Sequence, residues 1–154
     1  MKTLILFATK HGAAEEIAKK IAGHIDNAET FNLKNENLPK ISDYDQIIIG
    51  SSIYAGNFRK EAKAFLTQNT DELSKKKLAL FASGMGEPDN DEAFKSNVPE
   101  AILQASTVSS ILGGIYDPKK FNFFERLIMK IVTKQSGYFS NITDEKIKKF
   151  IEAL

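Results

Sequence analysis

LILFATKHGAAEEIAKKIA, residues 4–22, decides the fold, because it joins an apolar run to an amphipathic helical pattern through a short polar turn. Leu4–Ala8 is the apolar run, and it is followed by the turn Thr9–Ala14. The apolar residues after the turn share one face of a helix: Ile17, Ala18, Ile21, Ala22 and Ile25. This strand–turn–helix order is typical of α/β proteins.

The turn is a candidate anion site. Unpaired N–H groups and the positive end of the helix dipole favour an anion such as a phosphate there. Gly12 permits a tight turn, and Thr9 offers a hydroxyl. The turn matches neither G-x-G-x-x-G nor G-x-x-x-x-G-K-[ST], and any strand-to-helix turn needs a glycine and a small polar residue. A plain structural turn therefore stays open as the alternative.

Strand and helix patterns alternate along the rest of the chain. The expected strands are apolar or β-branched runs: Thr3–Ala8, Glu29–Leu33, Gln46–Ser51, Leu78–Ala82 and Val108–Leu112. Continuous runs such as Ile47–Ile49 are typical of strands covered on both faces. Thr143 is expected to cap a last helix whose apolar stripe is Ile147, Phe150, Ile151 and Leu154. The sequence predicts one domain, residues 1–154, with the three-layer α/β architecture of a doubly wound, five-stranded parallel sheet.

Composition excludes several classes of protein. A length of 154 residues suits one domain, and the absence of cysteine rules out disulfides and thiol chemistry. A net charge of +1 argues against a nucleic-acid binder. We find no signal peptide and no apolar stretch of about 20 residues, so a cytoplasmic protein is expected.

Three loops follow predicted strands, at the sheet edge where open α/β sheets bind ligands. The first is the Thr9–Ala14 turn. In the second, Tyr54 offers a ring face, and the small residues beside it suit a planar ligand: Ser51, Ser52, Ile53, Ala55 and Gly56. The third carries two glycines around a methionine: Ser83, Gly84, Met85 and Gly86. Ordinary strand-end turns have a similar composition, so no single loop is decisive.

Taken together, the loops resemble flavodoxin-type domains. The resemblance covers the whole chain and rests on the first turn, on YDQIIIGSSIY at residues 44–54, and on SGMG at residues 83–86. It implies the sheet order 2-1-3-4-5 and an FMN cofactor. The tail from Gly113 to Lys130, rich in Phe and Tyr before a basic helix, is most similar to the menaquinone-dependent protoporphyrinogen oxidase branch.

The resemblance implies a role for each loop. The phosphate would lie on Thr9, Lys10, His11, Gly12, Ala13 and Ala14, and the flavin ring between residues 51–56 and residues 83–86. Flavodoxins usually carry hydroxyl residues where this chain has Ala8 and Ala14. Each lost hydrogen bond to a charged phosphate removes about 1.5–3 kcal/mol, so backbone amides and Lys10 would have to compensate.

The segment Phe121–Lys134 combines a basic stripe with a broad apolar face. The basic residues of the stripe and the turn before it are Lys119, Lys120, Arg126, Lys130 and Lys134. One interpretation is a core helix that packs through Phe124, Leu127, Ile128 and Ile131 and has a solvated edge. The other is an interfacial helix that contacts anionic lipid at the inner membrane face, a quinone or an acidic redox partner.

Other chemistries fit poorly. A serine hydrolase motif fails at Tyr54, no carboxylates or histidines have metal-ligand spacing, and the acidic cluster of response regulators is missing after Phe7. We expect a flavodoxin-like redox protein without a catalytic side chain, because the flavin carries the chemistry. It would either shuttle electrons between proteins or oxidise a tetrapyrrole precursor and reduce a quinone. The alternative is a flavin-free module that binds a partner or a membrane.

Overall fold

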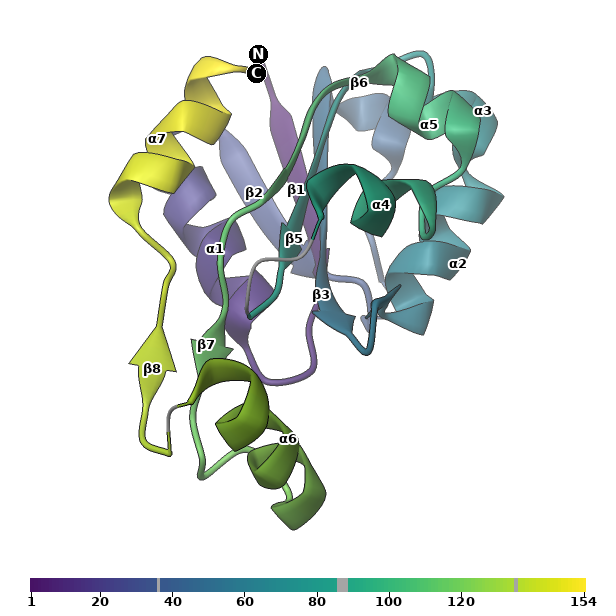
Figure 1. Cartoon of the computed structure of the whole chain (residues 1–154). Coiled ribbons are helices and arrows are strands. Elements are labelled where there is room, and N and C mark those ends of the chain that lie inside the picture. The colour runs from purple at the N-terminus through teal and green to yellow at the C-terminus, as the bar shows by residue number, and fades with distance from the viewer. Residues whose placement is uncertain (36, 86–88, 135) are drawn as a thin grey trace.

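The computed structural model describes residues 1–35, 37–85, 89–134 and 136–154. Its main sheet contains five parallel strands in the order β2-β1-β3-β5-β6 (Figure 1). Their bounds are β1 Thr3–Ala8, β2 Ala28–Asn32, β3 Gln46–Tyr54, β5 Lys77–Ser83 and β6 Ser106–Ile111. The short strand β4, Asn57–Phe58, pairs antiparallel with the end of β3. Numbered without β4, the parallel strands have the predicted order 2-1-3-4-5, so the predicted fold is confirmed.

Helices cover both faces of this sheet (Figure 1). One face carries α1 (Ala13–Ala22) and α7 (Asp144–Glu152), and η1 (Ile41–Asp43) lies before β3. The other face carries α2 (Lys60–Gln68), α3 (Thr70–Leu73), α4 (Asn90–Lys95) and α5 (Glu100–Ala105). Thr143 caps α7 as predicted, since its hydroxyl accepts the Lys146 N–H at 3.3 Å.

Each central strand contributes side chains to both layers of the core. In β1, Leu4 and Leu6 pack with the α2 side, whereas Ile5 and Phe7 pack with α1 and α7. Side chains alternate between the faces of a strand, so a strand that is apolar at every position must be covered twice. This accounts for the continuous apolar runs in the sequence.

After β6 the chain leaves the core in an excursion that comprises residues 113–141. It contains β7 (Ile115–Tyr116), α6 (Phe123–Thr133) and β8 (Phe139–Ser140), with β7 and β8 paired antiparallel. Figure 1 shows α6 beyond the carboxyl ends of the parallel strands. Asn122 begins α6 with a capping box, because its side chain accepts the Glu125 N–H and the Glu125 carboxylate accepts the Asn122 N–H.

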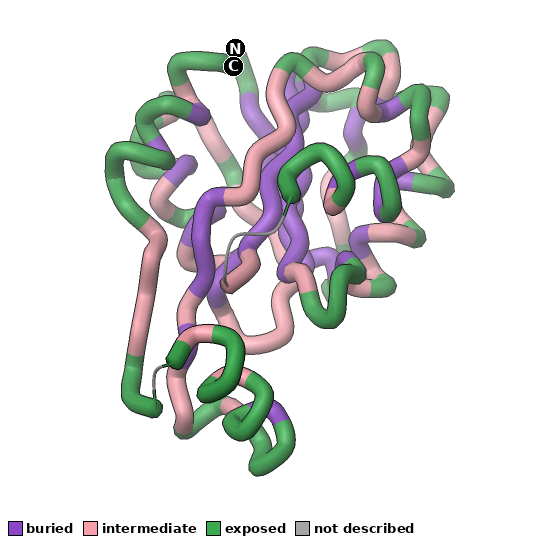
Figure 2. Tube along the Cα trace, viewed as in Figure 1, coloured by how far each residue is buried: buried purple, intermediate pink, exposed green. Residues whose placement is uncertain are grey.

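The predicted core face of α6 is wrong. Its members are exposed (Phe124 73%, Leu127 50%, Ile128 54% and Ile131 73%), and the helix is almost entirely exposed in Figure 2. Glu125 is the only buried residue of α6, all of whose residues the structure describes. The apolar stripe of α6 predicted that this helix packs on the sheet. The sheet face next to it is already covered by α1 and α7. In the described part of the chain, no helix has the length and hydropathy needed to cross a membrane.

Candidate functional site

The carboxyl ends of β1, β3 and β5 meet through a row of three hydroxyl groups. The Thr9 hydroxyl lies 3.4 Å from that of Ser52, which in turn lies 3.2 Å from that of Ser83. Parallel pairing of the strands places these residues at the same edge. The three loops predicted to act together are therefore adjacent.

The first loop leaves backbone N–H groups at the start of α1 without a side-chain cap. Gly12 is the N-cap of α1 at φ +96°, and its N–H donates to the Thr9 hydroxyl at 2.9 Å. Glycine has no side chain to cap the first-turn N–H groups, so these groups are available to an anion. Ala8 and Ala14 are completely buried, so at both positions the side chain contributes packing.

The second loop is a tight hairpin from β3 into β4. Ala55 and Gly56 have φ of +48° and +77°, the conformation of a two-residue turn between twisted strands. The Tyr54 side chain next to the turn is 41% exposed. Ser51, predicted to contact a ligand, is instead held inside, where its hydroxyl accepts the Arg59 N–H at 2.8 Å.

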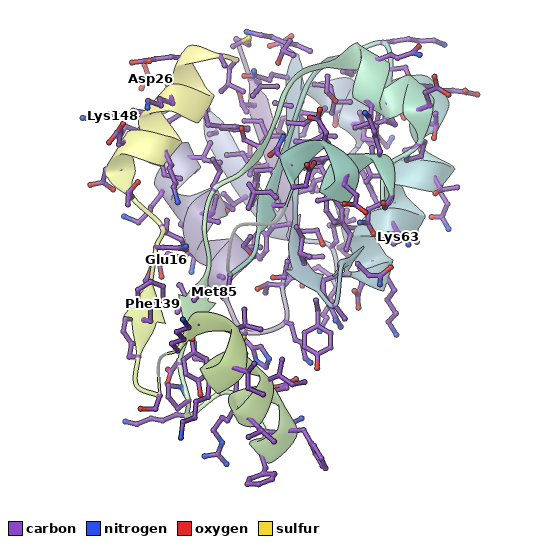
Figure 3. All side chains as sticks on the ribbon, in the orientation of Figure 1. Glu16, Asp26, Lys63, Met85, Phe139 and Lys148 are labelled. Atoms are coloured by element: carbon purple, nitrogen blue, oxygen red, sulfur yellow. The ribbon has the colours of Figure 1, made fainter. Side chains whose placement is uncertain are left out.

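The third loop packs against the start of the excursion. The Gly84 N–H donates to the Gly113 carbonyl at 3.0 Å. A Cβ on Gly114 would lie 2.9 Å from the backbone carbonyl carbon of Gly84, so only glycine permits this approach. Figure 3 labels Met85 at the end of the sheet, beside α6. Gly86, predicted to belong to the site, lies outside the described residues.

Glu125 of α6 joins the excursion to the first loop. Its carboxylate, 6% exposed, forms an ion pair with Lys10, whose ammonium also lies 3.5 Å from the centre of the Tyr54 ring. The other carboxylate oxygen lies 3.3 Å from Nε2 of His11, without the alignment of a hydrogen bond. The His11 ring stacks on Phe121, with 4.0 Å between ring centres.

Burial and neighbouring charges shift the pKa values of His11 and Glu125. Burial lowers the pKa of His11 below its usual value, and Glu125 offsets this only in part. Burial acts to raise the pKa of Glu125, but the Lys10 hydrogen bond, the Asn122 N–H and the nearby positive charge together hold it below its usual value. At neutral pH the site therefore contains the Glu125 carboxylate, paired with Lys10, and an uncharged His11 imidazole.

Glu125 and Phe121 line the cavity between the loops and the excursion, although the sequence did not predict them as site residues. The spacing Asn122-x-x-Glu125 is typical of a capping box and indicates where the helix begins, but not that the carboxylate reaches the first loop. All five predicted basic residues, Lys119, Lys120, Arg126, Lys130 and Lys134, are exposed. The Lys120 ammonium nevertheless lies over the first loop, 3.6 Å from the point where a Cβ on Gly12 would be.

A cavity of about 380 Å³ lies between the loops and the excursion, within the ~300–1,000 Å³ range of small-molecule sites. Lining residues from the predicted loops are Lys10, His11, Ala13, Ser52, Ile53, Tyr54, Ala55, Gly56, Ser83, Gly84 and Met85. The excursion adds Gly114, Ile115, Phe121, Glu125, Ile128, Met129 and Val132. Within the described ranges, no group of three carboxylate or imidazole side chains is placed to hold a metal ion.

Comparisons with known proteins agree with this architecture. Protoporphyrinogen IX dehydrogenase [quinone] of Escherichia coli (strain K12) is 24% identical over 147 residues, or 89% of this chain and 81% of that protein. A Lactobacillus acidophilus flavoprotein solved with FMN has a TM-score of 0.56 at 20% identity, over 73% of this chain and 92% of that one. Oxidised flavodoxin 1 of Bacillus cereus also has a TM-score of 0.56, at 18% identity over 99% and 93% of the two chains.

A family model, described as the flavodoxin domain, matches residues 4–143. This match spans all three loops and the excursion as well as the sheet. The chain therefore belongs to the flavodoxin domain family.

Proposed function

We propose that this protein binds FMN and works as a redox protein. The observation that carries the proposal is the convergence of three strand-end loops on one cavity, at the point between β1 and β3 where the chain order reverses. Family membership and the FMN-bound structural neighbour support this cofactor. When bound, the flavin supplies the electron transfer, and the chain holds and shields it.

The residues fit such a ligand. The glycine-capped start of α1 leaves N–H donors for a phosphate, with Thr9–Ala14 around it. Tyr54 and the β3–β4 hairpin would contact one face of the ring system, and Ser83–Met85 the other. We keep Gly86 in this proposed set on sequence grounds. None of these side chains is assigned a catalytic role.

The finer proposal is an oxidoreductase that passes electrons from a tetrapyrrole precursor to a quinone. The name of the Escherichia coli relative supports it, as does the apolar wall that α6 adds to the cavity through Ile128, Met129 and Val132. Such a wall suits an apolar reactant. The competing possibility within the family is electron transfer between proteins without a small-molecule substrate.

The visible spectrum of the purified protein, followed by titration with FMN, tests the cofactor. We expect flavin absorbance bands and saturable quenching of FMN fluorescence. A colourless protein that leaves FMN fluorescence unchanged would mean a flavin-free binding module. With flavin present, turnover of protoporphyrinogen with a quinone separates the oxidase from the carrier.

We further propose that the excursion docks on anionic membrane surfaces. Large apolar side chains of α6 are exposed: Phe123, Phe124, Leu127, Ile128, Ile131 and Val132. Basic residues adjoin this apolar face, whereas the only acidic residue of α6, Glu125, is buried. A helix with an exposed apolar face and basic neighbours is typical of interfacial helices.

Sedimentation with lipid vesicles tests the docking. We expect the protein to pellet with phosphatidylglycerol-containing vesicles and not with phosphatidylcholine alone. Phe124→Ser/Ile131→Ser should abolish pelleting, because both side chains are exposed on the apolar face that would contact the membrane. Equal pelleting with both lipids, or none, would contradict the proposal.

A further inference from the structure

Two lysines lie close to the phosphate loop, Thr9–Ala14, and they are placed differently. Lys10, within the loop, has its ammonium on the buried Glu125 carboxylate and over the Tyr54 ring. Its charge is therefore largely balanced by the protein itself. Lys120, more than a hundred residues later, has its ammonium beside Gly12 at the start of α1.

The loop needs such a cation if it holds a phosphate monoester. A monoester carries about −1.5 to −2 charge at pH 7. Ala8 and Ala14 are buried and bring no hydroxyl donor, so Thr9 is the only residue of the loop with a hydroxyl group. Without Lys120, the loop offers mainly backbone N–H groups to a strongly charged ligand.

The backbone of Lys120 is fixed relative to this loop. Its N–H donates to the Asp117 carbonyl at 2.9 Å, in the turn that follows β7. The next residue, Phe121, stacks on His11 and meets the buried Tyr116 edge-on, with 5.0 Å between those ring centres. These contacts hold the backbone of Lys120 beside the loop, within reach of its exposed side chain.

We propose that Lys120 binds the flavin phosphate, so that the excursion completes the cofactor site and selects the phosphorylated flavin. This inference rests on the proposed FMN binding. Under this proposal, the acidic and basic residues of the excursion have different functions. Glu125 fixes Lys10 and the helix, and Lys120 provides the charge that the ligand requires.

Titration of Lys120→Met with FMN and with riboflavin, which lacks the phosphate, tests the assignment. We expect the FMN dissociation constant to rise about tenfold, as for loss of a charged hydrogen bond, with riboflavin affinity unchanged. Lys119→Met is the matched control, because it removes the neighbouring exposed lysine. Lys120→Arg should retain most of the FMN affinity, and added salt should weaken FMN binding less in Lys120→Met than in wild type.

Each other outcome has a definite meaning. Equal weakening of FMN and riboflavin would show that Lys120 acts through the shape of the excursion, and no change in either would show that it makes no contact. Both results overturn the inference while FMN binding by the wild type stands. If the wild type bound neither flavin, the proposed function itself would fall, and the inference with it.

Discussion

His11 lies where the first loop, Thr9–Ala14, meets the excursion, and its protonation should reduce the stability of the fold. Burial lowers its pKa, so the unfolded chain, with a histidine pKa of about 6.5, binds the proton more readily. Stability should therefore be complete above about pH 6.5 and decrease as the pH falls toward the folded-state pKa. Urea unfolding across this range, for wild type and His11→Gln, checks it.

In that experiment His11→Gln should lose the part of the pH dependence that comes from the imidazole. The carboxylates titrate in both proteins, so their contribution cancels when the two free energies of unfolding are subtracted. NMR titration gives the same quantity directly, because the ring protons of His11 report its midpoint. A midpoint at or above about 6.5 would contradict the inferred direction.

Glu125 should hold the excursion against the loop at neutral pH. Glu125→Gln keeps the shape but leaves Lys10 without its counter-charge, so we expect faster amide exchange in α6 and little change in the sheet. The folded pKa of Glu125 is depressed, so its contribution is present above an unfolded pKa of about 4.3 and is lost as the pH falls through the folded value. Limited proteolysis at pH 7 and at about pH 3 compares the two states.

In this comparison, wild type and Glu125→Gln should differ at neutral pH and converge in acid. Glu145→Gln is the matched control, because that carboxylate belongs to an exposed pair with Lys149 on α7. A uniform loss of protection through the sheet would instead show that Glu125 stabilises the whole fold.

The sequence could predict candidate site residues only where they lie at the ends of strands, because the sheet topology alone brings those ends together. Thr9, Ser52 and Ser83 lie at or just after the carboxyl ends of parallel strands, so parallel pairing brings them together. Glu125 and Lys120 reach the first loop because of how the excursion folds back. That contact joins residues more than a hundred positions apart, and no local pattern specifies it.

At the scale of elements, β3 and β5 pack closely where Gly50 of β3 faces Phe81 of β5. A Cβ on Gly50 would lie 1.9 Å from the Phe81 ring, which is completely buried and meets Phe150 edge-on. Gly50→Ala must therefore displace this ring toward α7. Overpacking of this kind costs about 1–3 kcal/mol, occasionally more, and we expect a loss at the upper end in urea unfolding.

A double-mutant cycle separates this clash from loss of backbone freedom. In Gly50→Ala/Phe81→Leu the smaller side chain leaves room for the methyl group, so the double variant should lose less stability than the sum of the single variants. Additive losses would mean that Phe81 does not oppose the new methyl group.

The sequence patterns located all five parallel strands to within three residues at either end. The bounds of β1 match the prediction, and Thr143 caps α7. The interpretation failed for α6, whose apolar periodicity is as clear as that of any core helix. Periodicity shows that one face of a helix is apolar, but whether that face packs on the sheet depends on which sheet surfaces other helices already cover.

At the scale of the whole molecule, the excursion leaves and rejoins the core at a single point. The Gly114 N–H donates to the Asn141 side chain at 2.7 Å, and the Asn141 N–H donates to the Gly114 carbonyl at 3.1 Å. Core packing on either side, through Leu112 and Ile142, does not depend on α6. The topology was predictable because right-handed crossovers leave few alternatives, whereas an insertion after the last strand is free of that constraint.

This geometry predicts that the excursion can be removed without loss of the core. Replacing residues 115–140 with a short glycine linker joins two points that are already adjacent, and closing a short loop costs little entropy. We expect native-like far-UV circular dichroism and cooperative unfolding. Because Lys120 and the exposed face of α6 are absent, we also expect weaker FMN binding and no pelleting with anionic vesicles.

A deletion protein that folds yet keeps full FMN affinity would place the whole phosphate site in the core, and one that fails to fold would show that the buried Tyr116 belongs to the core itself.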